Sequence, residues 1–362
     1  MNLLILQPDQ HDGCSWYRVS QFAKESKKHG VDFKYLSSTI SNDDMASLIE
    51  NADVFLMRLN DKSIQVLQDL RKFQPNKPII LDIDDAYDDI DPLSNMYLTL
   101  GTKEVQLSDG RWLHQDGKNF SVKENQKRLD EYKQVMRGVD GIIVTTFELK
   151  AYAQEFNDNV VVIPNCINTD LFPAVSIQKK PLRLVWAGGS SHYADLVELN
   201  TVLKDLMRKY PDLEYYHVGQ MFRGIIKDLP ENRVFTSPWL MPDGHGFRLA
   251  TIGADIGVCP LQEIEFNRYK SSVKYYEYSA LRIATVAKNM PPYSDDIVAG
   301  KNGLLYGSTD ELRTHIEYLI NNPLERITLA QNAYEYVTKY RNLKEITKDW
   351  VEYLTGMSEA MK

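Results

Sequence analysis

The strongest constraint on the fold is a repeated alternation of short apolar runs with longer amphipathic segments. Strands of a parallel sheet are buried on both faces and therefore read as short, continuous apolar runs. Such runs occur at 3–6, 54–57, 78–83, 141–144 and 160–163, and again at 184–186, 213–218, 255–259, 283–287 and 304–306. Segments of helical pattern separate many of them, for example 17–29, 147–156 and 196–210. The alternation predicts βαβ units and an α/β fold of doubly wound parallel sheets.

A polar connector interrupts this alternation once. It follows the run at 160–163, contains Pro164 and Asn165, and ends at Lys179-Lys-Pro181. The full length of 362 residues is enough for two domains of ordinary size. We therefore predict an N-terminal domain at 1–165, a C-terminal domain at 166–342 and a separate terminal helix at 343–362.

One insertion departs from the pattern, at about 92–120. It contains Asp109-Gly110 within Val105–His114, and a second pair, Asp116-Gly117, follows. An Asp-Gly pair between alternating runs signals a β-hairpin. The insertion is either a substrate lid or a surface decoration. A basic helix at 122–137 follows it.

Composition limits the classes of function. The formal net charge of −8 argues against a surface built as a whole for nucleic-acid backbones, although a local basic groove stays compatible with it. The sequence has no apolar run long enough to span a bilayer and no signal-peptide pattern. Its three cysteines are far apart, which fits a reducing cytoplasm.

The segment 265–280 carries the clearest chemical pattern. It follows the predicted strand at 256–260, and its Lys270, Lys274 and Glu277 are spaced four and three apart, which predicts one helix face. Two lysines near a helix start suit a diphosphate, and a carboxylate one turn later can accept hydrogen bonds from a ribose. The alternative is a solvated face with ordinary ion pairs.

Four motifs, in order along 139–320, resemble retaining glycosyltransferases of the GT-B fold, in the broad group called family 4. They are Val162–Phe172, Leu184–Ser190, Asp255–Leu261 with Phe266–Tyr278, and Pro292-Tyr293 with Gly300–Leu304. Two weaker similarities, Asp12–Arg18 and Leu81–Asp85, point to a branch with bacterial and phage-encoded members.

The resemblance implies two Rossmann-like domains facing a cleft, with helix 343–362 returning to the first. It also implies transfer of a hexosyl or pentosyl group, with retention, from a UDP- or GDP-sugar to an acceptor hydroxyl. No metal or other cofactor is expected. Asp82 and Asp84 are spaced two apart, which matches a metal-binding pattern. The resemblance instead favours the reading that this motif ends a strand and places an acidic residue beside the sugar.

The resemblance also assigns site residues. The acidic candidates are Asp84 and Asp85, one of which takes the acceptor proton, and Lys270 stabilises the departing diphosphate. The acceptor side takes Tyr17, Arg18 and Trp112, with a surface-helix role as the alternative for Arg18. The donor side takes Gly13, Gly188, Gly189, Ser190, His192, Lys270, Lys274 and Glu277.

Two departures from the family pattern concern the donor side. Tyr269 stands where the family has a first glutamate, and Glu263 or Glu265 is the possible substitute. The segment 190–195 lacks the Arg and Lys that many members use to hold the diphosphate.

The acceptor stays open at this point. A glycan or lipid-linked glycan is the first expectation, with peripheral membrane contact through helix 122–137. The alternatives are a hydroxymethylated base in DNA, in a host cytoplasm if the chain is phage-encoded, and a non-catalytic binding protein.

Overall fold

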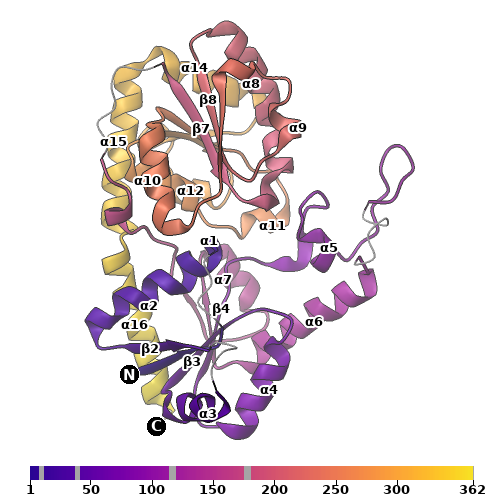
Figure 1. Ribbon diagram of the computed structural model, residues 1–362, viewed down its shortest axis with the longest axis vertical. Helices are drawn as coiled ribbons and strands as arrows, with labels where there is room; N and C mark the ends of the chain where they lie inside the picture. Colours follow the sequence, from indigo (N-terminus) through magenta and orange to yellow (C-terminus); the bar gives the residue numbers. More distant parts are fainter. Residues whose placement is uncertain (8–11, 37–40, 114–119, 175–180, 362) are drawn as a thin grey trace. The chain divides into compact units, whose positions relative to one another are not determined.

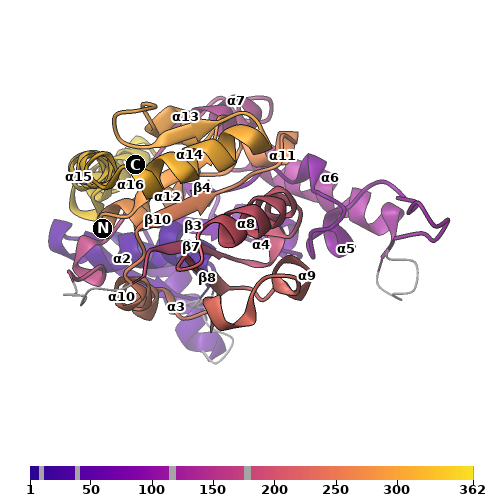
Figure 2. The ribbon, with the colours of Figure 1, turned by 90° about the horizontal axis from the view of Figure 1, so that it is seen from above.

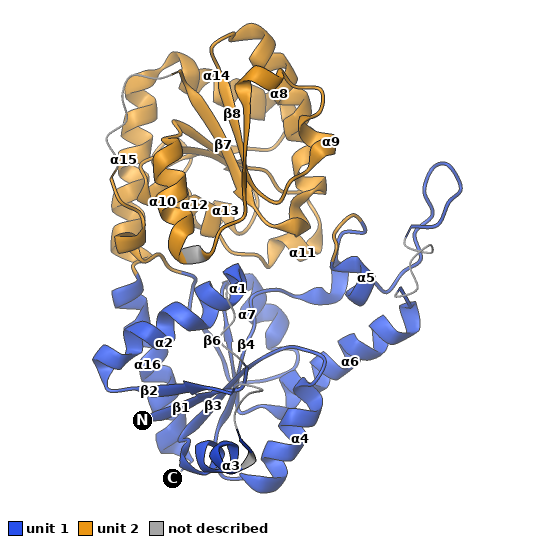
Figure 3. Cartoon of the chain, viewed as in Figure 1, with its two compact units in different colours: residues 1–92, 96–165, 343–362 blue, residues 93–95, 166–342 orange. Residues whose placement is uncertain are grey.

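The computed structural model describes residues 1–7, 12–36, 41–113, 120–174 and 181–361. These divide into two compact units, coloured separately in Figure 3. The first unit contains residues 1–92, 96–165 and 343–362, and the second contains 93–95 and 166–342. The chain therefore leaves the first unit near Asn165 and returns to it at Leu343.

Each unit contains one six-stranded parallel sheet with helices around it (Figure 1). The first sheet has the order β2-β1-β3-β4-β5-β6 and the second has β12-β11-β10-β7-β8-β9. The strands of the first sheet are β1 (Asn2–Ile5), β2 (Asp32–Tyr35), β3 (Val54–Arg58), β4 (Ile79–Asp82), β5 (Gly141–Val144) and β6 (Val160–Val162). Those of the second are β7 (Arg183–Gly188), β8 (Glu214–Gly219), β9 (Val234–Pro238), β10 (Ile256–Cys259), β11 (Ala284–Lys288) and β12 (Leu304–Tyr306).

Most α-helices lie between strands in sequence, and three follow the last strand, β12. In the first unit they are α1 (Gly13–Ser15), α2 (Gln21–Ser26), α3 (Asn42–Asn51), α4 (Ser63–Phe73), α5 (Tyr97–Leu100), α6 (Val122–Gly138), α7 (Phe147–Ala153) and α16 (Leu343–Ala360). In the second they are α8 (Val197–Lys209), α9 (Arg223–Ile226), α10 (Pro242–Ile252), α11 (Glu265–Arg268), α12 (Val273–Ala280), α13 (Tyr293–Asp296), α14 (Thr309–Asn321) and α15 (Pro323–Tyr340). The predicted doubly wound α/β fold is confirmed.

The core of the second unit explains where its helices lie. Alternate strand residues such as Leu184, Trp186 and Val258 are fully buried against apolar side chains of α8 and α14, which Figure 2 shows side by side. On the opposite face, α12 approaches β10 so closely that a Cβ on Gly257 would lie 2.4 Å from the ring of Tyr278. The close packing of this strand with α12 fixes the position of the segment that the sequence singled out.

The C-terminal helix belongs to the first unit, as predicted. α16 packs on α2, where the indole of Trp350 stacks on Phe22 with ring centroids 5.8 Å apart. Both side chains are fully buried. Among the residues that the structure describes, no helix combines the length and apolarity needed to cross a bilayer.

The predicted hairpin in the insertion is present at its first turn. Gln106 and Trp112 form an antiparallel bridge, and Gly110 takes the left-handed φ of +85° that the turn requires. The second pair, Asp116-Gly117, lies outside the described residues.

Candidate functional site

The second sheet has a point where its strand order reverses. β8 and β9 follow β7 on one side, whereas β10, β11 and β12 lie on its other side. The carboxyl ends of β7 and β10 flank this reversal, which is where open α/β sheets bind ligands. Gly188 ends β7, and Ser190–His192 form the short helical turn η5 directly after it.

Three polar side chains form a hydrogen-bonded row at this edge. His192 Nδ1 lies 2.6 Å from Asp195 Oδ2, and His192 Nε2 lies 2.8 Å from Lys274 Nζ. Gly188 lies close to Lys274, because a Cβ at position 188 would lie 3.1 Å from Lys274 Cε. The structure thus brings together the predicted residues Gly188, His192 and Lys274, and adds Asp195.

The electrostatics of this hydrogen-bonded row favour an anionic ligand. Burial and the charges of Lys274 and Lys270 lower the pKa of His192 to about 3, so the imidazole is neutral. Burial and the nearby charge of Lys270 lower the pKa of Lys274 to about 8. Two cations held close together disfavour each other until an anion arrives.

The prediction that Lys270, Lys274 and Glu277 share one helix face is wrong for Lys270. Lys270 lies in the connection between α11 and α12, and only the other two stand on α12. Residues 269–272 separate the two helices, and at the end of this connection Ser272 Oγ donates to the carbonyl of Pro292 at 3.0 Å. Lys270 nevertheless acts on the site, since its charge lowers the pKa of Lys274.

Glu277 has an ionic partner that the sequence did not suggest. Its Oε2 lies 3.3 Å from Nε2 of His245, which stands on α10. Burial lowers the pKa of His245, but the charge of Glu277 and the bond between them outweigh burial and leave that pKa raised. The predicted ribose ligand is thus 5% exposed and already paired with an imidazole.

The remaining donor-side residues lie around the same edge. A Cβ on Gly189 would meet nothing within 4 Å, so this glycine borders open space. The Tyr269 hydroxyl donates to Glu265 Oε1 at 2.7 Å, and Glu263 pairs with Lys288 at 3.1 Å. Both acidic substitutes considered for the family's first glutamate therefore have partners of their own.

In the first unit, Arg18 is buried in an ion pair and is not an exposed residue of a surface helix. Arg18 and Asp82 are both fully buried and form a bidentate ion pair, with Nε–Oδ1 at 2.9 Å and Nη2–Oδ2 at 2.8 Å. Arg18 Nη1 also donates to the carbonyl of Ile163 and to Asn165. Through these contacts the buried guanidinium holds the loop after β6.

Asp84 lies in a second ionic group. Its Oδ1 accepts from Arg58 Nη2, and the thiol of Cys14 donates to it. Burial raises the pKa of Asp84, but Arg58 and the thiol bond hold it below its usual value. Asp82 and Asp84 therefore each have a guanidinium partner. Across the described ranges, no group of three or more His, Cys, Asp and Glu side chains is arranged to hold a metal ion.

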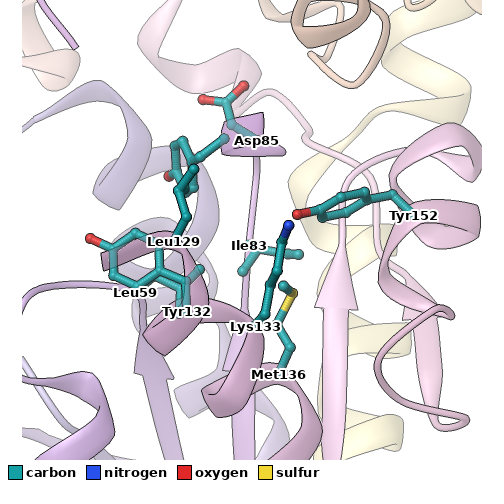
Figure 4. A pocket seen from close by; sticks show the side chains of 9 residues that line it. Leu59, Ile83, Asp85, Leu129, Tyr132, Lys133, Met136 and Tyr152 are labelled. Atoms are coloured by element: carbon teal, nitrogen blue, oxygen red, sulfur yellow. The ribbon is translucent and has the colours of Figure 1, made fainter. Parts of the chain in front are cut away.

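Asp85 lines a narrow pocket at the carboxyl edge of the first sheet (Figure 4). Its other lining residues include Tyr87, Tyr132 and Tyr152. Lys133 and Tyr152 point toward one another across it in Figure 4. The cavity volume is about 10 Å³. That is room for about one water.

The other first-unit candidates are spread over separate elements. Gly13 opens α1, and a Cβ there would meet nothing within 4 Å. Tyr17 is half-buried in the π-helical turn η1 (Trp16–Ser20). Trp112 is 40% exposed on the hairpin.

The basic helix α6 does not form a surface of one sign. Three of its five cations pair with acids: Lys127 with Glu131, Arg128 with Asp61, and Lys133 with Asp88. A surface groove of about 930 Å³ between α4 and α6 is lined by both lysines and acidic residues. This partial compensation weakens the support for binding to a DNA backbone.

Comparisons with known proteins place the fold. The chain matches no protein-family model and no curated protein. It is similar to the solved structure of a sucrose-phosphate synthase from Thermosynechococcus elongatus, with 14% identity, a TM-score of 0.71 and 99% of each chain covered. It is also similar to a glycosyltransferase from Rickettsia africae (14% identity, TM-score 0.64, 98% of each chain). A third structure is Anabaena HepE in complex with UDP (15% identity, TM-score 0.63, 98% of this chain and 99% of that one). These neighbours share the GT-B fold, which is the fold of this chain.

Sequence reasoning missed several residues of these ionic groups. Asp195 stands three residues after His192, a spacing that often joins side chains in a helical turn. His245 is flanked by glycines in a helix, which is a local signal of close packing. No sequence signal links Arg58 and Cys14 to Asp84, since three separate segments contribute them.

Proposed function

We propose that this protein is a glycosyltransferase that moves a sugar from a nucleoside-diphosphate sugar to an acceptor hydroxyl. The observation that carries the proposal is the group of Lys274, Lys270 and Glu277 at the strand-order reversal of the second sheet. Lysines whose charges disfavour each other suit a diphosphate, and this edge is the usual ligand site of such sheets. Structures of HepE with UDP and with UDP-glucose, on the same fold, support UDP as the nucleotide to test first.

The chemistry requires the leaving diphosphate to be stabilised while the acceptor attacks. We assign that task to Lys274 and Lys270, and ribose binding to Glu277. Gly188 and Gly189 allow the diphosphate to approach the backbone. Retention of configuration and independence from metal belong to this proposal through the resemblance to family 4.

On the acceptor side we propose Asp85 as the group that takes the proton. Asp84 is less suited, because its pairing with Arg58 lowers its pKa and weakens it as a base. Tyr17 and Trp112 are the proposed acceptor contacts, and a glycan or lipid-linked glycan is the proposed acceptor.

A binding assay tests the donor assignment. UDP-, GDP-, ADP- and CMP-sugars are added to the full chain in a thermal-shift screen, and hits are measured by calorimetry. We expect a UDP-sugar to stabilise the protein. Lys274→Ala and Glu277→Ala should each weaken binding about tenfold or more, because a hydrogen bond to a charged group contributes roughly 1.5–3 kcal/mol. The matched control is Lys204→Ala on α8, which removes an exposed lysine paired with Asp228. If no nucleotide sugar binds, the proposal fails.

A further inference from the structure

The side chain of Asp195 is buried, and both of its carboxylate oxygens have hydrogen-bond partners. It is 3% exposed. Its Oδ1 accepts from the backbone N–H of Gln262 at 2.8 Å and from Asn267 Nδ2 at 3.0 Å, while its Oδ2 faces His192 Nδ1 at 2.6 Å. The neighbouring His192 and the distant segment 262–267 thus hold one carboxylate in a single orientation.

This orientation determines which nitrogen of His192 carries the proton. A carboxylate only accepts, so Nδ1 must be the donor toward Asp195. The imidazole is neutral and has one N–H, so Nε2 is left with its lone pair. Lys274 Nζ, 2.8 Å away, is a group that only donates, and it donates to that lone pair.

We propose that Asp195 is a positioning residue of this site, which acts through the tautomer of His192 to hold the ammonium group of Lys274 against a nucleoside diphosphate. The inference rests on the proposed function, and it assigns the support of the phosphate-binding lysine to the segment 190–195. An ammonium group has three N–H donors, and the bond to His192 uses one of them. Held in this way, the lysine presents its charge beside Gly188 at the end of β7.

We call Asp195, His192 and Lys274 the relay. The substitution Asp195→Asn reverses the donor and acceptor roles within it, with little change in side-chain volume. The one amide oxygen of asparagine is retained by the donors of Gln262 and Asn267, so its NH₂ group turns toward His192 Nδ1. Nδ1 then becomes an acceptor and Nε2 carries the proton, which points a donor at the ammonium of Lys274. The lysine must move away, and the diphosphate loses its contact.

The experiment uses the full chain and two readouts. Long-range ¹H–¹⁵N spectra of histidine-labelled protein report the tautomer of His192, assigned with His192→Ala. We expect the Nδ1–H form in the unsubstituted protein and the Nε2–H form in Asp195→Asn. Calorimetry with UDP should show binding weakened about tenfold in Asp195→Asn, and the variant should keep a cooperative melting transition in the absence of ligand.

A double-mutant cycle separates positioning from a general structural role. In the Lys274→Ala background, Asp195→Asn should change UDP affinity less than twofold, since the lysine it positions is absent. Equal losses in both backgrounds would overturn the proposal, as would a reversed tautomer with unchanged UDP affinity. If UDP does not bind, the cycle uses the nucleotide that the thermal-shift screen identifies, and if no nucleotide sugar binds, the proposed function fails. The relay is then judged by the tautomer alone, and an Nε2–H form in the unsubstituted protein would refute it.

Discussion

At the residue scale, the donor-side lysine is prepared for an anion by an environment that disfavours its charge. The pKa of Lys274 is about 8, lowered by burial and by Lys270, so near neutral pH most molecules carry the ammonium form. A bound diphosphate favours that form and raises the pKa again. Ligand binding and proton binding at this lysine are therefore linked.

This linkage predicts how nucleotide affinity depends on pH. Affinity should be full below about pH 8 and fall by about tenfold per pH unit above it, because binding then requires uptake of a proton. Lys274→Arg should remove the decline, since a guanidinium stays charged throughout this range. Calorimetric titration with UDP between pH 7 and 9 measures both. The same decline in the arginine variant would assign the titration to another group.

The buried pair of Arg18 and Asp82 leads to a stability prediction. Arg18→Met leaves a carboxylate buried without its partner, which should lower the free energy of unfolding by about 3–5 kcal/mol. The double variant Arg18→Met, Asp82→Leu should recover much of the loss, because it removes both charges. Urea unfolding followed by circular dichroism gives both values. A loss below about 1 kcal/mol in the single variant would contradict the assignment of a structural ion pair.

At the element scale, α10 brings His245 to Glu277, and its two glycines differ in their surroundings. A Cβ on Gly246 would lie 2.2 Å from the carbonyl oxygen of Leu171, which is backbone and cannot turn aside. A Cβ on Gly244 would meet nothing within 4 Å. Of these two glycines, only Gly246 packs closely against residues 171–172.

The two positions offer a matched pair of substitutions. Gly246→Ala should force α10 away from residues 171–172 and lower stability by about 1–3 kcal/mol. Gly244→Ala should be neutral or stabilise by up to about 1 kcal/mol, because alanine is the better helix former. Melting temperatures of the two variants decide the matter, and equal effects would show that the contact at Leu171 is not limiting.

The same scale shows what a sequence can predict. Strands buried on both faces, such as β3 and β10, were predicted because all their residues but one are buried. The edge strands β2 and β9 were missed, since their exposed positions break the apolar run. Lys274 and His192 were found from local motifs, but the Arg18–Asp82 pair joins residues 64 apart and no local pattern indicates it.

At the scale of the whole molecule, the path of the chain makes the two units unequal. Apart from residues 93–95, the second unit is one continuous segment, 166–342, and it contains every donor-side residue described above except Gly13. The first unit is assembled from separate segments and includes α16. The two units should therefore respond differently to being isolated.

We predict that residues 166–342 fold cooperatively and bind UDP within about tenfold of the full chain, because the relay and Glu277 are complete within them. Residues 1–165 alone lack Trp350, which stacks on Phe22. Loss of a buried aromatic side chain typically costs about 3–5 kcal/mol. That fragment should bind a hydrophobic dye and melt without a sharp transition.

The placement of the termini supplies the control for that experiment. Thr355 Oγ1 lies 3.9 Å from Met1 Sδ, and both chain ends belong to the first unit (Figure 1). Residues 343–362 joined ahead of Met1 by a flexible linker can therefore occupy the position of α16. We expect this rearranged chain to regain a cooperative melting transition, measured by calorimetry, and to lose the dye. The same chain with Trp350→Ala should regain neither. Cooperative melting of 1–165 without the helix would show that α16 is dispensable to the first unit.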